Sequence, residues 1–204
     1  MVSRANLMIR RAQAADAPDI ARLVLLSAEH FLPAIFGPRI GHALECLAAR
    51  WGTLFSHEHA WMAESDGKTA GMLLSYSGRE KAAEDLATGI GLFRMLGLGM
   101  VRRLGRLLRL QGTLGRVASG EWYVSNMAVY EDHRGKGIGA RLMDFTETEA
   151  RSVGCTNLVL DVETDHLPAR RLYARLGYEQ HAITEISLGG SVFRLFRMAK
   201  KTPA

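Results

Sequence analysis

The chain has 204 residues, of which 48% are hydrophobic and 23% are charged, and these values are close to those of an average soluble globular protein. This composition excludes a disordered or collagen-like chain, and no apolar run reaches the ~18 residues that a membrane-spanning helix needs. The net charge of +5 fits an anionic ligand such as a nucleotide, but it fits nucleic acid or an acidic membrane surface equally well. Cys46 and Cys155 lack metal-ligand spacing and the first residues contain no signal-peptide run, so we expect a cytoplasmic protein without a disulfide framework.

The first half of the chain predicts a strand, two helices and a hairpin. Pro18 follows Asp16 at an early helical position, which is a helix start signal, and Gly37-Pro38 ends the helical spacing of apolar residues. Asp66-Gly67 between two apolar-rich runs is the turn chemistry of a β-hairpin. In chain order, these predicted elements are a strand over 8–12, helices over 20–36 and 43–55, and strands over 59–64 and 69–77.

The second half of the chain alternates strands and helices. Gly177 is positioned to end the shorter of the two helices. The predicted elements are a strand over 121–130, a helix over 138–153, a strand over 157–163, a helix over 169–176, and strands over 178–188 and 191–199. This order predicts an α/β layer fold of the α+β kind, with a mixed sheet that is largely antiparallel and has some parallel pairing. We expect one domain over 1–204, with an insertion at about 78–120.

The most informative stretch of the sequence is the loop Arg134-Gly135-Lys136-Gly137-Ile138-Gly139, which lies between a predicted strand and a predicted helix. The first N–H groups of a helix have no backbone partner, the helix dipole adds positive charge there, and glycines let a phosphate approach the backbone. Arg134 and Lys136 add charged donors. The third glycine is misplaced for a dinucleotide-binding fingerprint, and Lys136 is followed by glycine rather than by Ser or Thr, so neither of the two familiar nucleotide loops fits.

The loop resembles the Arg/Gln-x-x-Gly-x-Gly/Ala loop of the GNAT superfamily of N-acetyltransferases. Residues 166–178 resemble a second motif of that family, Asn-x-x-Ala-x-x-Leu-Tyr-x-x-x-Gly-Phe/Tyr, with His166 in the place of the asparagine. The positions in register are Ala169, Leu172, Tyr173, Gly177 and Tyr178. The resemblance covers 8–199 except 78–120. It implies the GNAT fold with a helical insertion between the third and fourth strands, and acetyl-CoA as cosubstrate without a metal.

The resemblance also implies where coenzyme A binds. The loop would hold the pyrophosphate, and the main chain of Met127 and Val129 would pair with the pantetheine arm as an added strand would. His166 would contact that arm, or it is a solvated helix-cap residue, and the two alternatives stay open. The implied coenzyme-binding residues are Met127, Ala128, Val129, Arg134, Gly135, Lys136, Gly137, Ile138, Gly139, His166, Ala169 and Tyr173.

Transfer of an acetyl group from a thioester to an amine requires a proton acceptor for the amine and a proton donor for the leaving thiolate. By resemblance Tyr173 lies beside the sulfur and is the predicted acid. Asp161 occupies the place of an acidic residue that is the base in some relatives that acetylate protein N-termini, and Glu121 is a second candidate. Both carboxylates also have an ordinary explanation as strand charges near the edge of the sheet.

The acceptor is predicted to be a primary amine, either of a small molecule or of a protein N-terminus, which attacks acetyl-CoA directly. Residues 78–120 contain an apolar stripe, and all charges over 92–109 are arginine, so this stretch is expected to form a helical lid over the acceptor site. The alternative is a coenzyme A-binding regulatory or membrane-docking module that uses these arginines. The apolar stripe consists of Phe93, Leu96, Met100, Leu104 and Leu107.

Two further classes of partner are not expected. Nucleic-acid binding is disfavoured, because the basic stretch lacks interleaved aromatic residues and no reader motif occurs. His57 and His59 would share one strand face, but no further ligand lies near them in sequence, so we expect a solvated loop end rather than a metal site. The chain is expected to be a monomer or a homodimer.

Overall fold

The computed structural model describes residues 7–97, 115–188 and 190–202, and its centre is one sheet of seven strands in the order β1-β2-β3-β4-β5-β7-β6. The strands are β1 (Leu7–Arg11), β2 (Ala60–Ser65), β3 (Lys68–Ser77), β4 (Glu121–Val129), β5 (Asn157–Glu163), β6 (Glu179–Leu188) and β7 (Ser191–Lys201). All neighbours are antiparallel except β4 and β5, which are parallel. The predicted α/β fold with a mixed, largely antiparallel sheet is confirmed.

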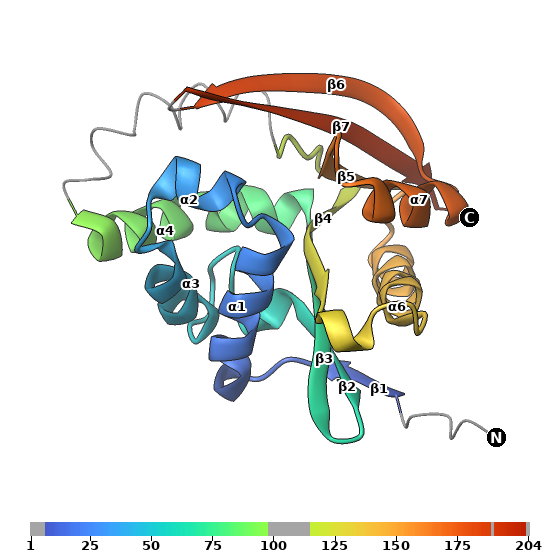
Figure 1. Cartoon of the computed structure of the whole chain (residues 1–204), viewed down its shortest axis with the longest axis horizontal. Helices are drawn as coiled ribbons and strands as arrows, with labels where there is room; N and C mark the ends of the chain where they lie inside the picture. The colour runs from blue at the N-terminus through green and yellow to red at the C-terminus, as the bar shows by residue number, and fades with distance from the viewer. Residues whose placement is uncertain (1–6, 98–114, 189, 203–204) are drawn as a thin grey trace.

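Helices cover both faces of the sheet, α1 to α4 on one side and α6 and α7 on the other (Figure 1). Alternate residues of β3 serve the two sides: Met72 and Leu74 belong to the core beneath α1 and α3, whereas Leu73 belongs to the core beneath α6. The helices are α1 (Ala17–Ser27), α2 (Phe31–Phe36), α3 (Ile40–Ala48), α4 (Gly78–Leu96), α6 (Ile138–Ser152) and α7 (Leu167–Arg175), with short 3₁₀ turns η1 (Ala14–Asp16), η2 (His57–His59) and η4 (Glu131–His133).

The single helix predicted over 20–36 is wrong, because the structure contains two helices there, α1 and α2. The hydroxyl of Ser27 donates to the Val24 carbonyl at 2.7 Å and accepts from the side-chain amide of Asn126 at 2.8 Å. Ala28 then leaves the helical region, with φ of −148°. Ser27 is therefore fixed at the end of α1 by a residue of the distant strand β4. The predicted end at Gly37 is confirmed, since Gly37 has φ of 91°.

The second predicted helix extends too far, since α3 ends at Ala48 rather than near 55. The Thr53 hydroxyl donates to the Leu47 carbonyl at 3.2 Å, and Gly52 turns the chain with φ of 71°. The predicted hairpin is confirmed: Asp66 and Gly67 have φ of 52° and 75°, as the two central residues of a tight hairpin turn require.

The expectation of a solvated loop end at 57–59 is wrong. His57 and His59 are both buried, and each ring has a polar partner. His57 Nδ1 lies 2.8 Å from the carbonyl oxygen of Ala48, and His59 Nε2 lies 2.8 Å from the carboxylate of Glu84 on α4. Both are core histidines, and over 7–97, 115–188 and 190–202 no group of three or more His, Cys, Asp or Glu residues could hold a metal ion.

The predicted insertion follows β3, and its first part is the helix α4. A reciprocal cap begins this helix: Ser77 Oγ accepts from the Glu80 N–H, and the Glu80 carboxylate accepts from the Ser77 N–H at 2.7 Å. Leu96 packs against the core beneath α1, whereas Phe93 is 48% exposed. The other members of the predicted stripe, and all arginines between 102 and 109, lie outside the described residues, so the lid stays a prediction. No helix in the described part of the chain is long and apolar enough to cross a membrane.

Candidate active site

A cavity of about 760 Å³ opens where β4 and β5 part. The two strands pair in parallel only from Glu121–Asn157 to Val124–Leu160. At the next residue β4 carries a bulge, because its register against β3 skips Ser125. Beyond the bulge, the β5-facing edge of 126–129 has no strand partner within the described sheet. Backbone donors and acceptors therefore face the cavity, where an extended ligand could pair with them.

One end of the cavity, the loop end, is built by the glycine-rich loop and the start of α6. Gly135 and Gly137 have φ of 76° and 78°, a conformation that favours glycine, and a Cβ on either would meet open space. Gly137 is the N-cap of α6, so the unpaired N–H groups of the first helical turn follow it directly. A Cβ at Gly139 would lie 3.0 Å from Leu172 Cδ2, which shows how closely α6 approaches α7.

Most of the predicted coenzyme-binding residues lie together in the lining of this cavity. Lys136 and the predicted base Glu121 are described in the structure but lie outside that lining. Arg134 also lines the cavity, and its Nε donates to the Val129 carbonyl at 3.0 Å, which fixes the loop against the end of β4. The predicted residues in the lining are Met127, Ala128, Val129, Arg134, Gly135, Gly137, Ile138, Gly139, Asp161, His166, Ala169 and Tyr173.

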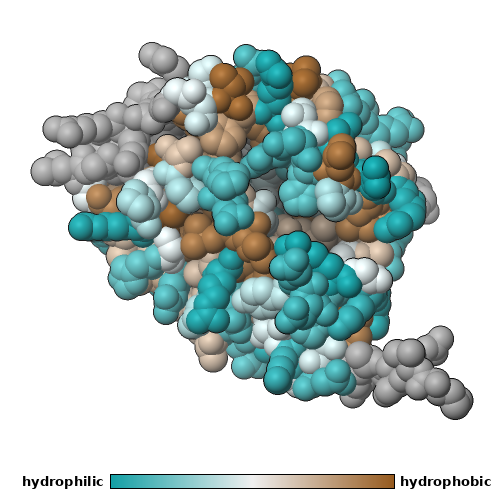
Figure 2. Space-filling model, in the orientation of Figure 1, coloured by the Kyte–Doolittle hydropathy of each residue, from teal (hydrophilic) through white to brown (hydrophobic). Residues whose placement is uncertain are grey.

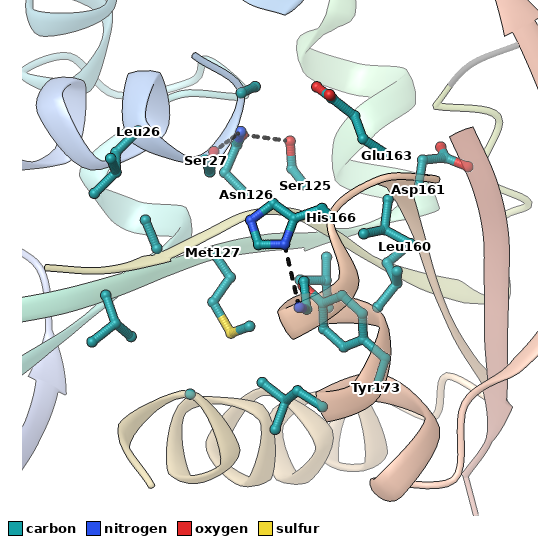
Figure 3. A pocket seen from close by; sticks show the side chains of 18 of the residues that line it. Leu26, Ser27, Ser125, Asn126, Met127, Leu160, Asp161, Glu163, His166 and Tyr173 are labelled. Carbon is teal, nitrogen blue, oxygen red and sulfur yellow. Dashed lines mark hydrogen bonds between the residues drawn. The ribbon is translucent and has the colours of Figure 1, made fainter. Parts of the chain in front are cut away.

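Tyr173 and His166 lie on α7 and at its start, beside the main chain of β4 (Figure 3). The Tyr173 side chain is only 7% exposed, and burial raises the pKa of its phenol above the usual range, so the phenol stays protonated at neutral pH. His166 Nδ1 accepts from the Ala169 N–H at 3.3 Å, so His166 caps α7. The same ring lines the cavity, so its role as a cap and a role in ligand contact do not exclude each other.

The two predicted bases have different surroundings. Asp161 has a side chain 9% exposed, and its Oδ2 accepts from Arg197 at 2.9 Å, from the Tyr123 hydroxyl at 3.0 Å and from the Gly115 N–H at 3.3 Å. Glu121 accepts from the Ala118 N–H at 2.8 Å and faces the same arginine at 4.0 Å. Arg197 is therefore hydrogen-bonded to Asp161 and forms only a long ion pair with Glu121.

Sequence reasoning missed Glu163, which follows Asp161 on the same face of β5 and also lines the cavity. In Figure 3 its carboxylate is turned toward the side of the cavity on which Ser27 and Asn126 lie. Burial, and then the neighbouring Asp165, raise the pKa of the Glu163 carboxyl above its usual value. The alternation of charged and apolar residues along β5 could have indicated this position. The cavity wall on the other side of the site, however, is formed by α1 and α2, which are remote from β5 in sequence.

The end of the cavity away from the loop, the α2 end, is largely apolar. The described face in Figure 2 is hollowed near its centre, with hydrophobic side chains beside the hollow. The Asn126 amide closes part of the floor: it donates to Ser27 and accepts from the Ser125 hydroxyl at 3.0 Å. The apolar residues of this end are Leu26, Ala28, Phe31, Leu32, Ile35, Phe36 and Phe55.

The chain is similar to known proteins in its sequence family, in individual relatives and in solved structures. A profile described as the Acetyltransferase (GNAT) family matches residues 31–178. The chain is 35% identical over 89 residues to "GCN5-related N-acetyltransferase 4, chloroplastic" of Arabidopsis thaliana, covering 44% of this chain and 31% of the relative. It is 35% identical over 82 residues to "Acetyltransferase Atu2258" of Agrobacterium fabrum, covering 40% of this chain and 58% of the relative. The match therefore spans less than two thirds of the length of either relative.

Solved structures share the fold at low sequence identity. An N-acetyltransferase from Staphylococcus aureus Mu50 has a TM-score of 0.68 at 20% identity, covering 95% of this chain and 100% of that chain. YncA from Salmonella typhimurium, solved with its cofactor acetyl-CoA, has a TM-score of 0.62 at 17% identity, covering 97% of this chain and 94% of that chain. At sequence identities this low, the structural similarity shows only that the fold is shared.

Proposed function

The chain belongs to the acetyltransferase (GNAT) family, and from this premise we propose that it is an N-acetyltransferase, which transfers the acetyl group of acetyl-CoA to a primary amine. The observation that carries the proposal is the cavity where β4 and β5 part, with unpaired strand backbone along one wall and the glycine-rich loop at one end. An extended pantetheine arm with a pyrophosphate matches both features.

Each part of the site has a task in this reaction. The N–H groups at the start of α6, with Arg134, bind the pyrophosphate, and the open edge of β4 holds the pantetheine and polarises the thioester carbonyl. The neutral amine then forms a C–N bond with the carbonyl carbon and the C–S bond breaks. Tyr173, which is protonated at neutral pH, donates its proton to the leaving thiolate. Overall, an ammonium and a thioester give an amide, a thiol and one proton released to solvent.

The alternative of a regulatory or membrane-docking module depends on arginines that lie outside the described residues, and no observation favours it. Family membership by itself is compatible with either predicted acceptor, a small-molecule amine or a protein N-terminus.

The test is calorimetric titration of the protein with acetyl-CoA, followed by a thiol-release assay with a panel of amines. We expect micromolar binding that is lost in Gly137→Glu, because the new carboxylate would repel the pyrophosphate. Gly154→Glu is the matched control: Gly154 has φ of 76° at the other end of α6, so both variants carry the same backbone strain. Lack of binding by the unmutated protein, or equal loss in both variants, would contradict the proposal.

A further inference from the structure

The α2 end of the cavity has a roof as well as an apolar wall. The helix α2 reaches the β6–β7 hairpin, where Ile35 belongs to a small core with Ile186, Leu188 and Leu195. The rings of Phe31 and Phe193 meet edge to face with centroids 5.3 Å apart. Figure 1 shows β6 and β7 extending over the molecule to α2. This contact packs α2 against the hairpin, and Leu195 of β7 also lines the cavity, so the hairpin adds to the apolar surroundings of the α2 end.

Some of the charged side chains at this end have ion-pair partners and one has none among the described residues. Lys81 lines the cavity, but its ammonium is held by both carboxylate oxygens of Asp85, at 2.6 and 2.7 Å. Asp161 is likewise held by Arg197. Within the described residues the Glu163 carboxylate has neither an ion pair nor a hydrogen bond, although it is partly buried in the cavity wall. The site therefore presents a carboxylate with no hydrogen bond or ion pair among the described residues beside an apolar wall, with His30 and His166 near enough to act on its charge.

We infer that the acceptor is a small monoamine with an apolar or aromatic body, whose ammonium group lies against Glu163 and whose body lies against the wall of α2. This inference rests on the proposed transferase function and names the acceptor class of that site. Glu163 then takes one proton from the ammonium, and the neutral nitrogen attacks the thioester as described above. The nitrogen loses its second proton as the amide forms; this proton restores the Tyr173 phenol, and Glu163 releases the first proton to solvent.

Three other classes of amine fit these features less well. An amino acid brings a carboxylate, which the Glu163 carboxylate would repel, and the ammonium of Lys81 in the cavity lining is already paired with Asp85. A polyamine brings a second ammonium group, which would be placed against Phe31, Ile35 and Phe36 at a high cost in desolvation. A protein N-terminus brings peptide N–H and C=O groups, which the apolar side chains of the α2 end cannot pair.

The test measures binding of four amines by calorimetry to the protein saturated with coenzyme A, which cannot react. Phenethylamine is compared with phenylalanine, putrescine and a short peptide with an N-terminal phenylalanine, and thiol release is measured with acetyl-CoA. Phenethylamine is expected to bind at least about tenfold more tightly than the other three. Glu163→Gln should weaken its binding about tenfold, since a charge-assisted contact is lost, with unchanged affinity for coenzyme A.

Glu179→Gln is the matched control, because Glu179 is exposed on β6 and lies outside the cavity. Phe31→Ala tests the wall separately and should weaken binding of phenethylamine but not of putrescine. Tighter binding of putrescine or the peptide, or unchanged binding of phenethylamine to Glu163→Gln, would overturn the inference. Thiol release with those other amines would leave the transferase function standing, whereas tight binding of phenethylamine without thiol release would refute that function and leave only the binding pocket.

Discussion

Tyr173 illustrates how burial adapts a single side chain to the proposed chemistry. Its ring lies against Tyr178, with centroids 5.9 Å apart, and its pKa is raised by loss of water contact rather than by a neighbouring charge. A phenol of raised pKa is a weak acid, but a thiolate that forms beside this buried phenol is a strong acceptor, because burial disfavours that charge too. The position of the phenol therefore matters more than its acidity.

Tyr173→Phe should lower kcat about 100-fold and leave the Kd of acetyl-CoA within a factor of about three, because only proton donation is removed. The measurement is steady-state thiol release beside calorimetric titration. Tyr178→Phe is the control, since Tyr178 is also buried and contacts Tyr173 but does not line the cavity. Equal activity of Tyr173→Phe and the unmutated protein would rule out this role.

At the scale of elements, the linkage from β1 through η1 to α1 depends on charge. Arg10 donates to both carboxylate oxygens of Asp16, at 2.7 and 2.9 Å, and to Glu64 on β2 at 2.6 Å. Asp16 also accepts from the Gln13 N–H at 2.7 Å. The hydrogen bonds from Arg10 lower the pKa of Asp16 in the folded protein, with the Gln13 N–H adding to the effect.

Asp16→Asn should lower the free energy of unfolding by about 1–2 kcal/mol at neutral pH. Because the folded-state pKa is depressed, the contribution of Asp16 is fully present above its unfolded pKa of about 3.9 and is lost as the pH falls through the lower folded value. Urea unfolding at neutral pH and at about pH 2 should therefore show a difference that shrinks in acid. A difference that is constant with pH would contradict this account.

The helix α4 offers a pair of glycines with opposite expectations. A Cβ at Gly78 would lie 2.6 Å from the carbonyl carbon of Ala118, and this backbone cannot move aside cheaply, whereas a Cβ at Gly89 would meet open space. Gly78→Ala should cost about 2 kcal/mol or more of stability. Gly89→Ala should add about 0.5–1 kcal/mol, because alanine is the better helix former. Urea unfolding of both variants checks the pair, and similar shifts in both would show that α4 does not pack this way.

Helix and strand boundaries could be predicted where adjacent residues determine them, and they were missed where they depend on residues far away in the sequence. Asp66-Gly67 specifies its hairpin through two positive φ angles that these residues tolerate. The break after Ser27 depends on Asn126, which lies 99 positions further along the chain. Glu163 was missed as a site residue for the same reason. The glycine-rich loop could be recognised because its donors are backbone groups whose arrangement depends on a few adjacent glycines.

At the scale of the molecule, the sheet is continuous at one end of β4 and divided at the other. Antiparallel pairing holds β3 to β4 and β5 to β7, but β4 and β5 share only the pairs from Glu121–Asn157 to Val124–Leu160. The cores beneath α1 and α6 are separate clusters on the two sheet faces. A ligand that pairs with β4 and contacts α6 and α7 would connect both halves.

Acetyl-CoA at about 100-fold its Kd should therefore stabilise the folded protein by about 2.7 kcal/mol and raise Tm by about 5–10 °C. Hydrogen exchange should show new protection at the amides of 126–129, whose β5-facing edge is open. Phosphate at the same concentration is the control, since it would fill the loop end without reaching β4. A rise in Tm with no change in exchange at β4 would place the coenzyme elsewhere.

The cavity has one end made of main chain and one end made of side chains. At the loop end, binding depends on backbone N–H groups that glycines leave accessible. The positive φ angles of Gly135 and Gly137 limit which residues can replace them. At the α2 end, the wall consists of replaceable side chains on a helix of six residues. The two ends are thus free to change independently over evolution: descendants of this sequence could acquire new acceptors through substitutions in α2 while inheriting the donor site intact, and a protein engineer could follow the same route.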